Sequence, residues 1–342
     1  MRIRGMGRLK RLMRRMAAPF RSEVIILLYH RVFDAPSDPQ LLCVKPKHFA
    51  EHLEHLRRHY RVMNLGELGD ALKEGQLPKR AIIITFDDGY VDNLLNAKPL
   101  LERYEMPATV FVATGYFGRM FWWDELEQLV LQASSLPERL KVTVNGKIHE
   151  WYLGREQGEV SEEPWNVECP YNPTSRHRAY RELHRLLHLL GNEEREAALS
   201  QLRAQADVGE NDGRATSRAM KPEEICRLAE GGLIEIGSHT ETHPVLSALP
   251  IEEQRREIRE SKRRLEEILG SPVTAFSYPY GGKADIGRHA VGLVQEAGYL
   301  LACANFPAPV NRWTNPFLLP RYLVRDWDGE EFARRLHGWF YG

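Results

Sequence analysis

Two pairs of residues in this chain have types and a spacing that could serve metal-assisted hydrolysis. Asp87 and Asp88 are adjacent carboxylates in the segment TFDDGY, and His239 and His243 lie four residues apart in the segment SHTETHP. Neighbouring side chains of an extended chain point in opposite directions, so one carboxylate can ligate a cation while the other faces a different partner. Two histidines at this spacing converge on one cation if the residues between them make a helical turn. Each motif is compatible with a metal site, and a turn and a pair of surface histidines are the plain alternatives.

The segment Phe276–Gly281 (FSYPYG) is a third candidate for the same site. Pro279 and Gly281 are typical of a turn. A rigid turn can direct a backbone N–H, here that of Tyr280, toward the oxyanion that develops when an acyl group is attacked. An ordinary turn would have the same composition, so the segment is an oxyanion-binding candidate only together with the other two motifs.

Each motif follows a segment whose composition predicts a buried strand, which is where α/β folds place their sites. Strands and helices alternate along most of the chain. The expected strands are Val24–Tyr29, Ala81–Phe86, Ala108–Ala113, Leu233–Gly237, Val273–Tyr278, Leu300–Ala304 and Phe317–Val324. The expected helices are Lys47–Tyr60, Asp92–Tyr104, Pro222–Ala229, Ile251–Leu269 and Ile286–Ala297. Repeated strand–helix units predict a largely parallel sheet, either open or closed.

Residues 115–219 break this alternation, and we interpret them as an insertion between two halves of one α/β domain, residues 23–114 and 220–342. Three segments of the insertion have recognisable patterns: a short helix, a hairpin about Asn145-Gly146 and a polar helical region. They are Phe121–Leu131, Leu140–Leu153 and Ser175–Ala206. The aromatic run Phe121-Trp122-Trp123-Asp124 near its start is equally compatible with stacking on sugar rings and with core packing.

Charge is distributed unevenly along the chain. Residues 1–21 hold eight of the 47 basic side chains and none of the 47 acidic ones, so the remainder carries a net charge of −8. A mildly acidic body argues against a nucleic-acid partner. We expect residues 1–22 to form a basic arm, either solvated or lying as an amphipathic helix on anionic lipid. Basic residues interrupt the apolar positions of this arm, which is unlike a secretory signal, and the four cysteines are scattered, which is unlike a disulfide framework. We therefore expect a cytoplasmic protein, which is peripheral on the inner membrane face if the arm binds lipid.

Taken together and in this order, the three motifs resemble those of the polysaccharide deacetylase family, also called the NodB homology domain or carbohydrate esterase family 4. The resemblance covers roughly Val24–Ala113 and Ile225–Val324 and leaves the insertion outside it. It implies a distorted (β/α) barrel, related to the TIM barrel, with a mainly helical insertion. It also implies a metal-dependent reaction that removes the acetyl group of an N-acetylated sugar.

Carried onto this chain, the resemblance makes Asp87 the general base and Asp88, His239 and His243 the ligands of one divalent ion. That ion is usually zinc, with cobalt, nickel and manganese as alternatives. One carboxylate and two imidazoles suit Zn²⁺ and leave a coordination position open. The unligated carboxylate can then take a proton from water, while the N–H of Tyr280, which follows Pro279, stabilises the oxyanion.

Two positions depart from the usual family pattern. Many members end with a Leu-x-His motif whose histidine protonates the leaving amine, whereas this chain has Leu-x-His after its first strand, as in a circularly permuted branch. His30 is therefore assigned as the general acid, with a capped loop histidine as the alternative, and His337, on an expected helix, is assigned a structural role. Ser277 stands where many relatives have an arginine that pairs with the base, and Arg321 is the candidate replacement, an ordinary surface arginine being the other interpretation.

The resemblance predicts a hydrolase of bacterial surface-polysaccharide or glycolipid assembly that deacetylates a polysaccharide or a lipid- or nucleotide-linked N-acetylated sugar. Two alternatives stay open. The same site would serve hydrolysis of another amide or of an O-acetyl ester on a glycan. Ser277, which cannot supply the positive charge of the missing arginine, suggests a catalytically weak glycan-binding protein.

Overall fold

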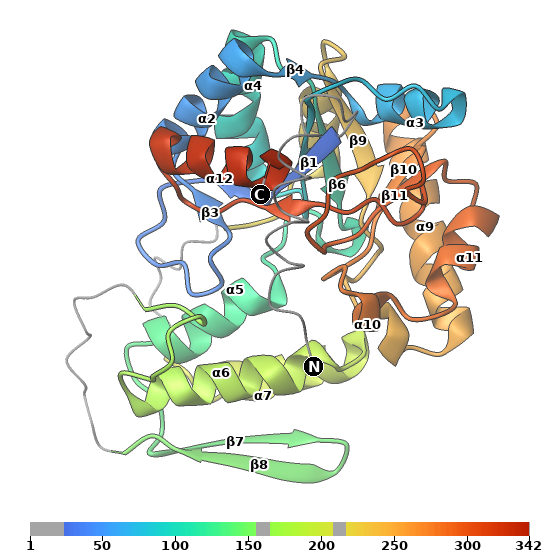
Figure 1. Ribbon diagram of the computed structural model, residues 1–342. Helices are drawn as coiled ribbons and strands as arrows, with labels where there is room; N and C mark the ends of the chain where they lie inside the picture. Colours follow the sequence, from blue (N-terminus) through green and yellow to red (C-terminus); the bar gives the residue numbers. More distant parts are fainter. Residues whose placement is uncertain (1–23, 155–164, 208–216, 342) are drawn as a thin grey trace, which may run out of the picture.

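The computed structural model describes residues 24–154, 165–207 and 217–341, so the predicted basic arm lies outside the described residues. Its main sheet contains eight strands that pair in parallel, in the order β11-β10-β9-β6-β5-β1-β12, with β4 beside the start of β5 (Figure 1). The strands are β1 (Val24–Tyr29), β4 (Arg61–Val62), β5 (Ala81–Phe86), β6 (Ala108–Val112), β9 (Ile234–Ser238), β10 (Ala275–Ser277), β11 (Leu301–Cys303) and β12 (Tyr322–Leu323).

An irregular segment, residues 319–323, closes the sheet into a distorted barrel. Leu319 exchanges backbone hydrogen bonds with the β11 edge, accepting from Ala304 N–H and donating to Ala302 O at 2.8 Å each. Three residues later the same segment has crossed to β1, where Tyr322 pairs with Leu27. The segment therefore bridges the two ends of the sheet, and Arg321 lies at the crossing.

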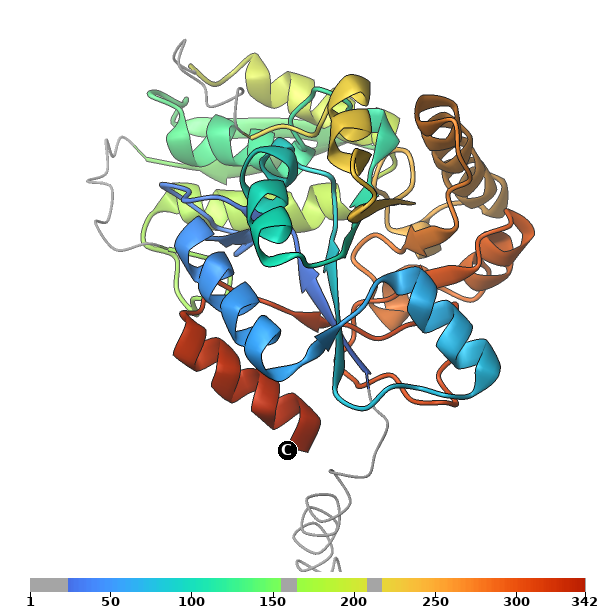
Figure 2. The same ribbon diagram turned by 90° about the horizontal axis from the view of Figure 1, so that it is seen from above.

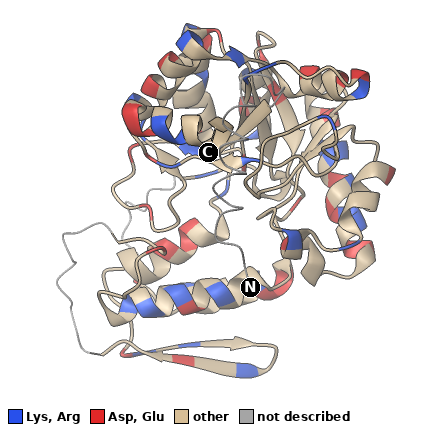
Figure 3. Ribbon diagram, viewed as in Figure 1, with Lys and Arg blue, Asp and Glu red and all other residues tan. Residues whose placement is uncertain are grey.

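Helices surround the barrel on its outer side (Figure 2). They are α2 (Pro46–His59), α3 (Leu65–Glu74), α4 (Lys98–Tyr104), α8 (Pro222–Ala229), α9 (Ile251–Leu269), α10 (Lys283–Ile286), α11 (Ala290–Glu296) and α12 (Gly329–Tyr341). Every residue of β1 and β5 is buried, as expected for strands whose two faces are both covered. Lysine, arginine, aspartate and glutamate mix along the outer faces of α2 and α9 (Figure 3). None of the described helices is long and apolar enough to cross a bilayer.

The insertion lies across the end of the barrel at which the strands end (Figure 1). It contains the helices α5 (Trp122–Glu127), α6 (Ser175–His188) and α7 (Asn192–Arg203), the π-helical turn η4 (Gln128–Gln132) and the antiparallel hairpin β7 (Arg139–Val144) with β8 (Lys147–Tyr152). Its apolar residues form a hydrophobic cluster separate from that of the barrel. The hairpin turns at Asn145 and Gly146, both in the left-handed conformation, as their sequence predicts.

Three expected elements differ from the structure. The helix expected at Asp92–Tyr104 begins with a π-helical turn, η2 (Asn93–Ala97), before α4. The helix expected at Ile286–Ala297 is interrupted after Ile286, where Gly287 adopts φ 70° and separates α10 from α11. The strand expected at Phe317–Val324 is reduced to β12, because the chain here crosses the seam of the barrel and Pro320 cannot donate to a ladder.

Candidate active site and metal centre

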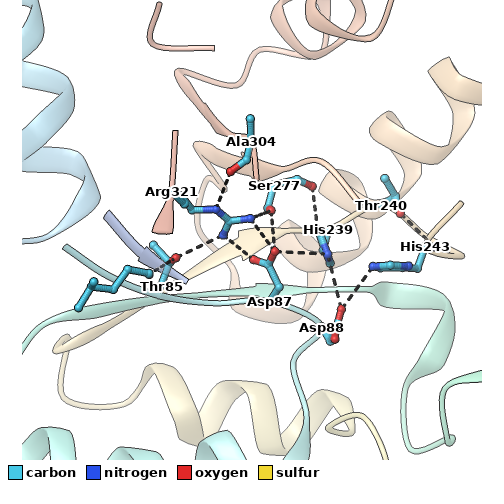
Figure 4. A network of polar contacts seen from close by, with 10 residues as sticks. Thr85, Asp87, Asp88, His239, Thr240, His243, Ser277, Ala304 and Arg321 are labelled. Carbon is cyan, nitrogen blue, oxygen red and sulfur yellow. Dashed lines mark hydrogen bonds and ion pairs between the residues drawn. The ribbon is translucent and has the colours of Figure 1, made fainter. Parts of the chain in front are cut away.

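Asp88, His239 and His243 converge at the ends of β5 and β9. Their potential ligand atoms lie within 4.8 Å of one another, and all three residues are buried (Figure 4). Asp88 Oδ1 is 3.6 Å from His239 Nε2 and 3.4 Å from His243 Nε2. Ligands about 2.0–2.2 Å from a tetrahedral Zn²⁺ are separated by distances of this size. Asp88 Oδ1 is buried without a hydrogen-bond partner, so the donor set fits a divalent cation.

The orientation of His239 also suits a metal ligand. Its Nδ1 lies 2.8 Å from the backbone carbonyl of Ser277, an acceptor, which identifies Nδ1 as the protonated nitrogen. Nε2 therefore presents its lone pair to Asp88 and His243. A second hydrogen bond that sets the tautomer of a ligating histidine is usual in metal sites.

The loop between the two histidines is not the helical turn that the sequence suggested. Thr240 and His243 both have left-handed backbones, with φ of 64° and 52°. Glu257, a buried residue of α9, holds the loop by accepting hydrogen bonds from the backbone N–H groups of Glu241 and Thr242, each at 2.8 Å. It also accepts from the Thr242 hydroxyl at 2.7 Å. The two imidazoles thus converge because a buried carboxylate fixes the loop.

Asp87 and Asp88 face different partners, as their adjacency predicted. Asp87 receives a bidentate pair of hydrogen bonds from Arg321, whose Nη1 and Nη2 lie 2.7 and 2.6 Å from Oδ1 and Oδ2 (Figure 4). The Ser277 hydroxyl accepts from Arg321 at 2.8 Å and donates to Asp87 at 3.1 Å. Arg321 is therefore not a surface residue, and it supplies the cation that Ser277 cannot. The reason for a catalytically weak site is removed.

The protonation state of Asp87 follows from these contacts. Burial raises the pKa of this carboxyl, but Arg321 and then His239 outweigh the effect and lower the pKa to about 2. Burial, followed by the neighbouring Asp87, raises the pKa of Asp88. Asp87 is consequently an ionised carboxylate in the resting site, which a proton acceptor must be.

His30 follows β1 and lies within electrostatic range of Asp87 and His239. Its backbone is held by side chains at the start of the π-helical turn. Asn93 Nδ2 donates to the His30 carbonyl at 2.9 Å, and Asp92 accepts from the Val32 N–H at 2.9 Å. Short π-helical segments occur frequently at functional sites, and this one positions the backbone on both sides of Arg31.

Burial lowers the pKa of His30 to about 4, although Asp87 opposes the shift. The ring is therefore neutral at pH 7 before substrate binds. By contrast His337, the other candidate for the acid, lies on α12 and contacts Tyr341 of the same outer helix at 4.7 Å between ring centroids. The structure brings His30 to the site and places His337 away from it.

The Pro279–Gly281 turn lies beside the metal ligands. Tyr280 has a left-handed backbone, with φ of 60°, and its ring lies 4.7 Å from that of His243 between centroids. Gly281 has φ of 67°, and a Cβ there would come within 2.6 Å of the backbone nitrogen of Asn305. Positive φ angles are strained in residues other than glycine, and four such residues lie at the site: Asp88, Thr240, His243 and Tyr280. Strain of this kind concentrates at functional sites.

The aromatic run of the insertion also reaches the site. Trp123 packs its ring against His243 at 4.9 Å between centroids, and its indole N–H donates to the Tyr90 hydroxyl at 2.7 Å. Trp122 packs against His184 at 4.8 Å and is almost fully buried. The run is therefore part of the insertion core and also contacts a metal ligand.

Sequence reasoning did not identify Glu257, Asn93 or Trp123 as members of the site. Glu257 is one of several acidic residues on a strongly charged helix, and only its burial distinguishes it. Asn93 carries no signal of its π-helical turn. The double tryptophan is conspicuous in the sequence, but large aromatic residues serve packing and function equally well.

Comparison with known proteins is consistent with this geometry. A family model described as polysaccharide deacetylase matches residues 74–135 and 188–301, slightly more than half of the chain. These ranges include Asp87, Asp88 and both histidines. His30 and Arg321 lie outside them, and their assignments rest on the geometry.

Curated relatives match shorter segments. The protein YxkH of Bacillus subtilis is 36% identical over 89 residues, which cover 25% of this chain and 30% of that protein. A poly-β-1,6-N-acetyl-D-glucosamine N-deacetylase of Staphylococcus aureus is 30% identical over 110 residues, covering 28% of this chain and 38% of the relative. The matches thus span about a third of the length of these relatives.

Solved structures share the fold. The Streptococcus pyogenes deacetylase PplD, solved in complex with acetate, superposes with a TM-score of 0.57 at 16% identity, over 92% of this chain and 98% of that one. IcaB from Ammonifex degensii gives a TM-score of 0.57 at 18% identity, over 94% and 98%. The likeness extends over most of the chain and confirms the predicted distorted (β/α) barrel.

Proposed function

Because this chain belongs to the polysaccharide deacetylase family, we propose that it is a metal-dependent hydrolase that removes acetyl groups from N-acetylated sugars. One observation carries the proposal. Of two adjacent buried carboxylates, Asp88 faces two histidines, whereas Asp87 is held ionised by Arg321. This division separates a cation ligand from a proton acceptor, which is what hydrolysis of an unactivated amide requires.

A bound divalent ion would polarise the acetyl carbonyl and acidify water. Asp87 accepts the proton from the attacking water, and the backbone N–H of Tyr280 stabilises the negative charge that develops on the carbonyl oxygen. The leaving nitrogen needs one proton, and water supplies that proton. His30 is neutral at rest and close enough to Asp87 for the carboxylate to influence its pKa. His30 gives its proton to the leaving nitrogen and recovers one from Asp87, which has taken it from the attacking water.

We propose zinc as the ion, because two imidazoles and one carboxylate form a borderline donor set that leaves a coordination position open. We propose a glycan containing N-acetylglucosamine as the substrate, free or linked to a lipid or nucleotide, in the assembly of a bacterial surface polysaccharide. The name of the Staphylococcus aureus relative supports this choice of sugar. An acid at the leaving group matters more for an amide than for an ester, so His30 favours N- over O-deacetylation.

The test is acetate release from N-acetylglucosamine oligosaccharides by the purified full chain. We expect release to stop after chelation, to return when zinc is added, and to be lost in Asp87→Asn. His55→Ala, a substitution on α2 remote from the site, is the matched control and should keep full activity. If an O-acetylated xylan oligomer is hydrolysed and no N-acetylated sugar is, the alternative of an O-acetyl esterase replaces the proposal.

We also propose that residues 1–21 bind anionic lipid and keep the enzyme on the inner membrane face. Eight basic residues without an acidic one support this, because each Lys or Arg near an anionic surface contributes about 1 kcal/mol. Co-sedimentation with phosphatidylglycerol vesicles should be lost when these residues are deleted. Equal sedimentation of both proteins would contradict it.

A further inference from the structure

Three adjoining side chains at the boundary between the barrel and the insertion each bury a polar atom that has no hydrogen-bond partner. The atoms are Trp122 Nε1 on α5, His188 Nδ1 on α6 and the hydroxyl oxygen of Tyr280 in the barrel turn. The rings of His188 and Tyr280 meet edge to face, 4.1 Å apart between centroids. Burial raises the pKa of Tyr280, and the nearby Trp122 N–H opposes that rise. The two groups do not complete a hydrogen bond with each other.

Unpaired atoms of this kind are exceptional within the insertion. Its other three indoles are all satisfied: Trp123 donates to Tyr90 at 2.7 Å, Trp151 to Glu182 at 2.8 Å and Trp165 to the Tyr171 carbonyl at 3.0 Å. Burying a polar group without a partner is unfavourable, and native structures rarely keep such groups without a reason. A ligand that completes the hydrogen bonds is such a reason.

These three side chains lie close to the proposed metal site. The Tyr280 ring lies 4.7 Å from that of the metal ligand His243. Its left-handed backbone is strained, and the surrounding structure maintains that strain. A group bound at Tyr280 therefore lies next to the acetyl group that is to be hydrolysed.

We propose that Trp122 and His188 of the insertion, together with Tyr280, form a subsite that binds a hydroxyl group of the sugar. This inference rests on the proposed function and specifies how its substrate is recognised. An indole N–H can only donate, whereas a tyrosine hydroxyl and a neutral histidine can donate or accept. A sugar hydroxyl, which does both, satisfies this combination.

An anionic ligand fits the subsite less well. The buried Arg195, whose guanidinium carbon lies 5.2 Å from the centre of the Trp122 ring, directs Nε to the Leu187 carbonyl at 3.1 Å and Nη2 to the Leu190 carbonyl at 2.7 Å. Its guanidinium is thus engaged in joining α6 to α7. Burial lowers the pKa of His188, so its ring is neutral at pH 7. The three side chains of the subsite are thus polar and uncharged, as a carbohydrate requires.

The test measures binding without turnover. Calorimetry on the metal-loaded Asp87→Asn protein would compare methyl N-acetyl-β-D-glucosaminide with its 3-, 4- and 6-deoxy analogues. Tyr280→Phe removes only the hydroxyl and should raise the dissociation constant of the parent sugar about fivefold to tenfold, the equivalent of one hydrogen bond of about 1–1.4 kcal/mol. One of the deoxy analogues should bind the Asp87→Asn protein equally weakly whether residue 280 is Tyr or Phe. The hydroxyl group that this analogue lacks is the one that Tyr280 binds.

A second measurement separates a subsite from a structural role. Because the Tyr280 hydroxyl has no partner, Tyr280→Phe should leave the melting temperature of the free protein unchanged or higher. Tyr278→Phe is the matched control and should lower it, since that hydroxyl donates to the Phe317 carbonyl at 3.1 Å. His188→Leu should weaken sugar binding in parallel with Tyr280→Phe.

Two outcomes would overturn the subsite. Unchanged sugar affinity with a lowered melting temperature in Tyr280→Phe would show that an ordered water completes the hydrogen bonds. Failure of the parent glycoside to bind at all would exclude this sugar as the ligand. The proposed function fails separately. If the deoxy analogues bind as expected but the wild-type protein releases no acetate, the subsite binds sugar and the hydrolytic proposal is wrong.

Discussion

The buried pair of Arg321 and Asp87 makes a quantitative prediction about stability. The arginine side chain is 0% exposed and the aspartate 5%, and two short hydrogen bonds join them. Arg321→Met keeps the approximate volume and removes the charge, so an ionised carboxylate is left without its cation. Removing one partner of a buried ion pair typically costs about 3–5 kcal/mol.

The pH dependence of this loss follows from the pKa of Asp87. In the wild-type protein that pKa is lowered to about 2 from 3.8, so the carboxylate contributes about 2 kcal/mol of stability above pH 4, which is lost as the pH falls toward 2. Without Arg321 the pKa of Asp87 rises, because His239 is then the main group that still opposes the effect of burial. As the pH falls, Asp87 is then protonated at a higher pH in the variant than in the wild type. The difference between their free energies of unfolding should therefore narrow below about pH 5.

Urea unfolding of the metal-free proteins, followed by circular dichroism at pH 7 and pH 4, measures both effects. In an Asp87→Asn background the same arginine substitution should cost little or nothing, because it then removes a buried cation that has already lost its carboxylate. Arg218→Met is the control: its bidentate partner Glu224 is partly exposed, so the loss should be at most about 1 kcal/mol. An equal loss in both backgrounds, independent of pH, would refute the assignment of Arg321 as the group that holds Asp87 ionised.

Three further predictions test the roles of individual residues. Asp87→Asn should retain bound metal while turnover falls about 10²–10⁴-fold, whereas Asp88→Asn should lose the metal, as elemental analysis would show; equal metal loss in both would reverse the division of roles. His30→Ala should abolish most amide hydrolysis and partly spare an activated ester, with His337→Ala near wild type in the same assay; the opposite pattern would transfer the acid to the outer helix. Glu257→Gln should weaken zinc affinity about 10–100-fold in a competition titration, because the loop between the two histidines loses its carboxylate; unchanged affinity would show that the loop holds itself.

Most of the barrel could be predicted from the sequence because its strands are short, apolar and regularly spaced. Val24–Tyr29 and Ala81–Phe86 form strands with the predicted boundaries, and Ile251–Leu269 is a helix with the predicted ends. The seam at residues 319–323 could not be predicted, since its path depends on where both ends of the sheet lie. The π-helical turn Asn93–Ala97 differs from an α-helix by one extra residue in the turn, which leaves no mark in composition.

The site divides in the same way. Asp87, Asp88, His239 and His243 were identifiable because they follow strands whose ends must meet. Arg321 could be named as a candidate but not placed, because its bidentate contact with Asp87 joins residues 234 positions apart. Glu257 and Trp123 act on the site only once α9 and the insertion have packed against the loop that carries the histidines. Their types are common in ordinary helices, so burial and contacts reveal what composition cannot.

The metal content of the protein is the sharpest test of the proposed site. We expect one divalent ion per chain in the purified protein, measured by mass spectrometry of the intact complex and by elemental analysis. His239→Ala/His243→Ala should bind none while its circular dichroism spectrum stays that of the wild type, because three ligands from two strand ends must converge for binding. A stoichiometric ion retained in the double variant would contradict the assignment of Asp88, His239 and His243 as the metal site.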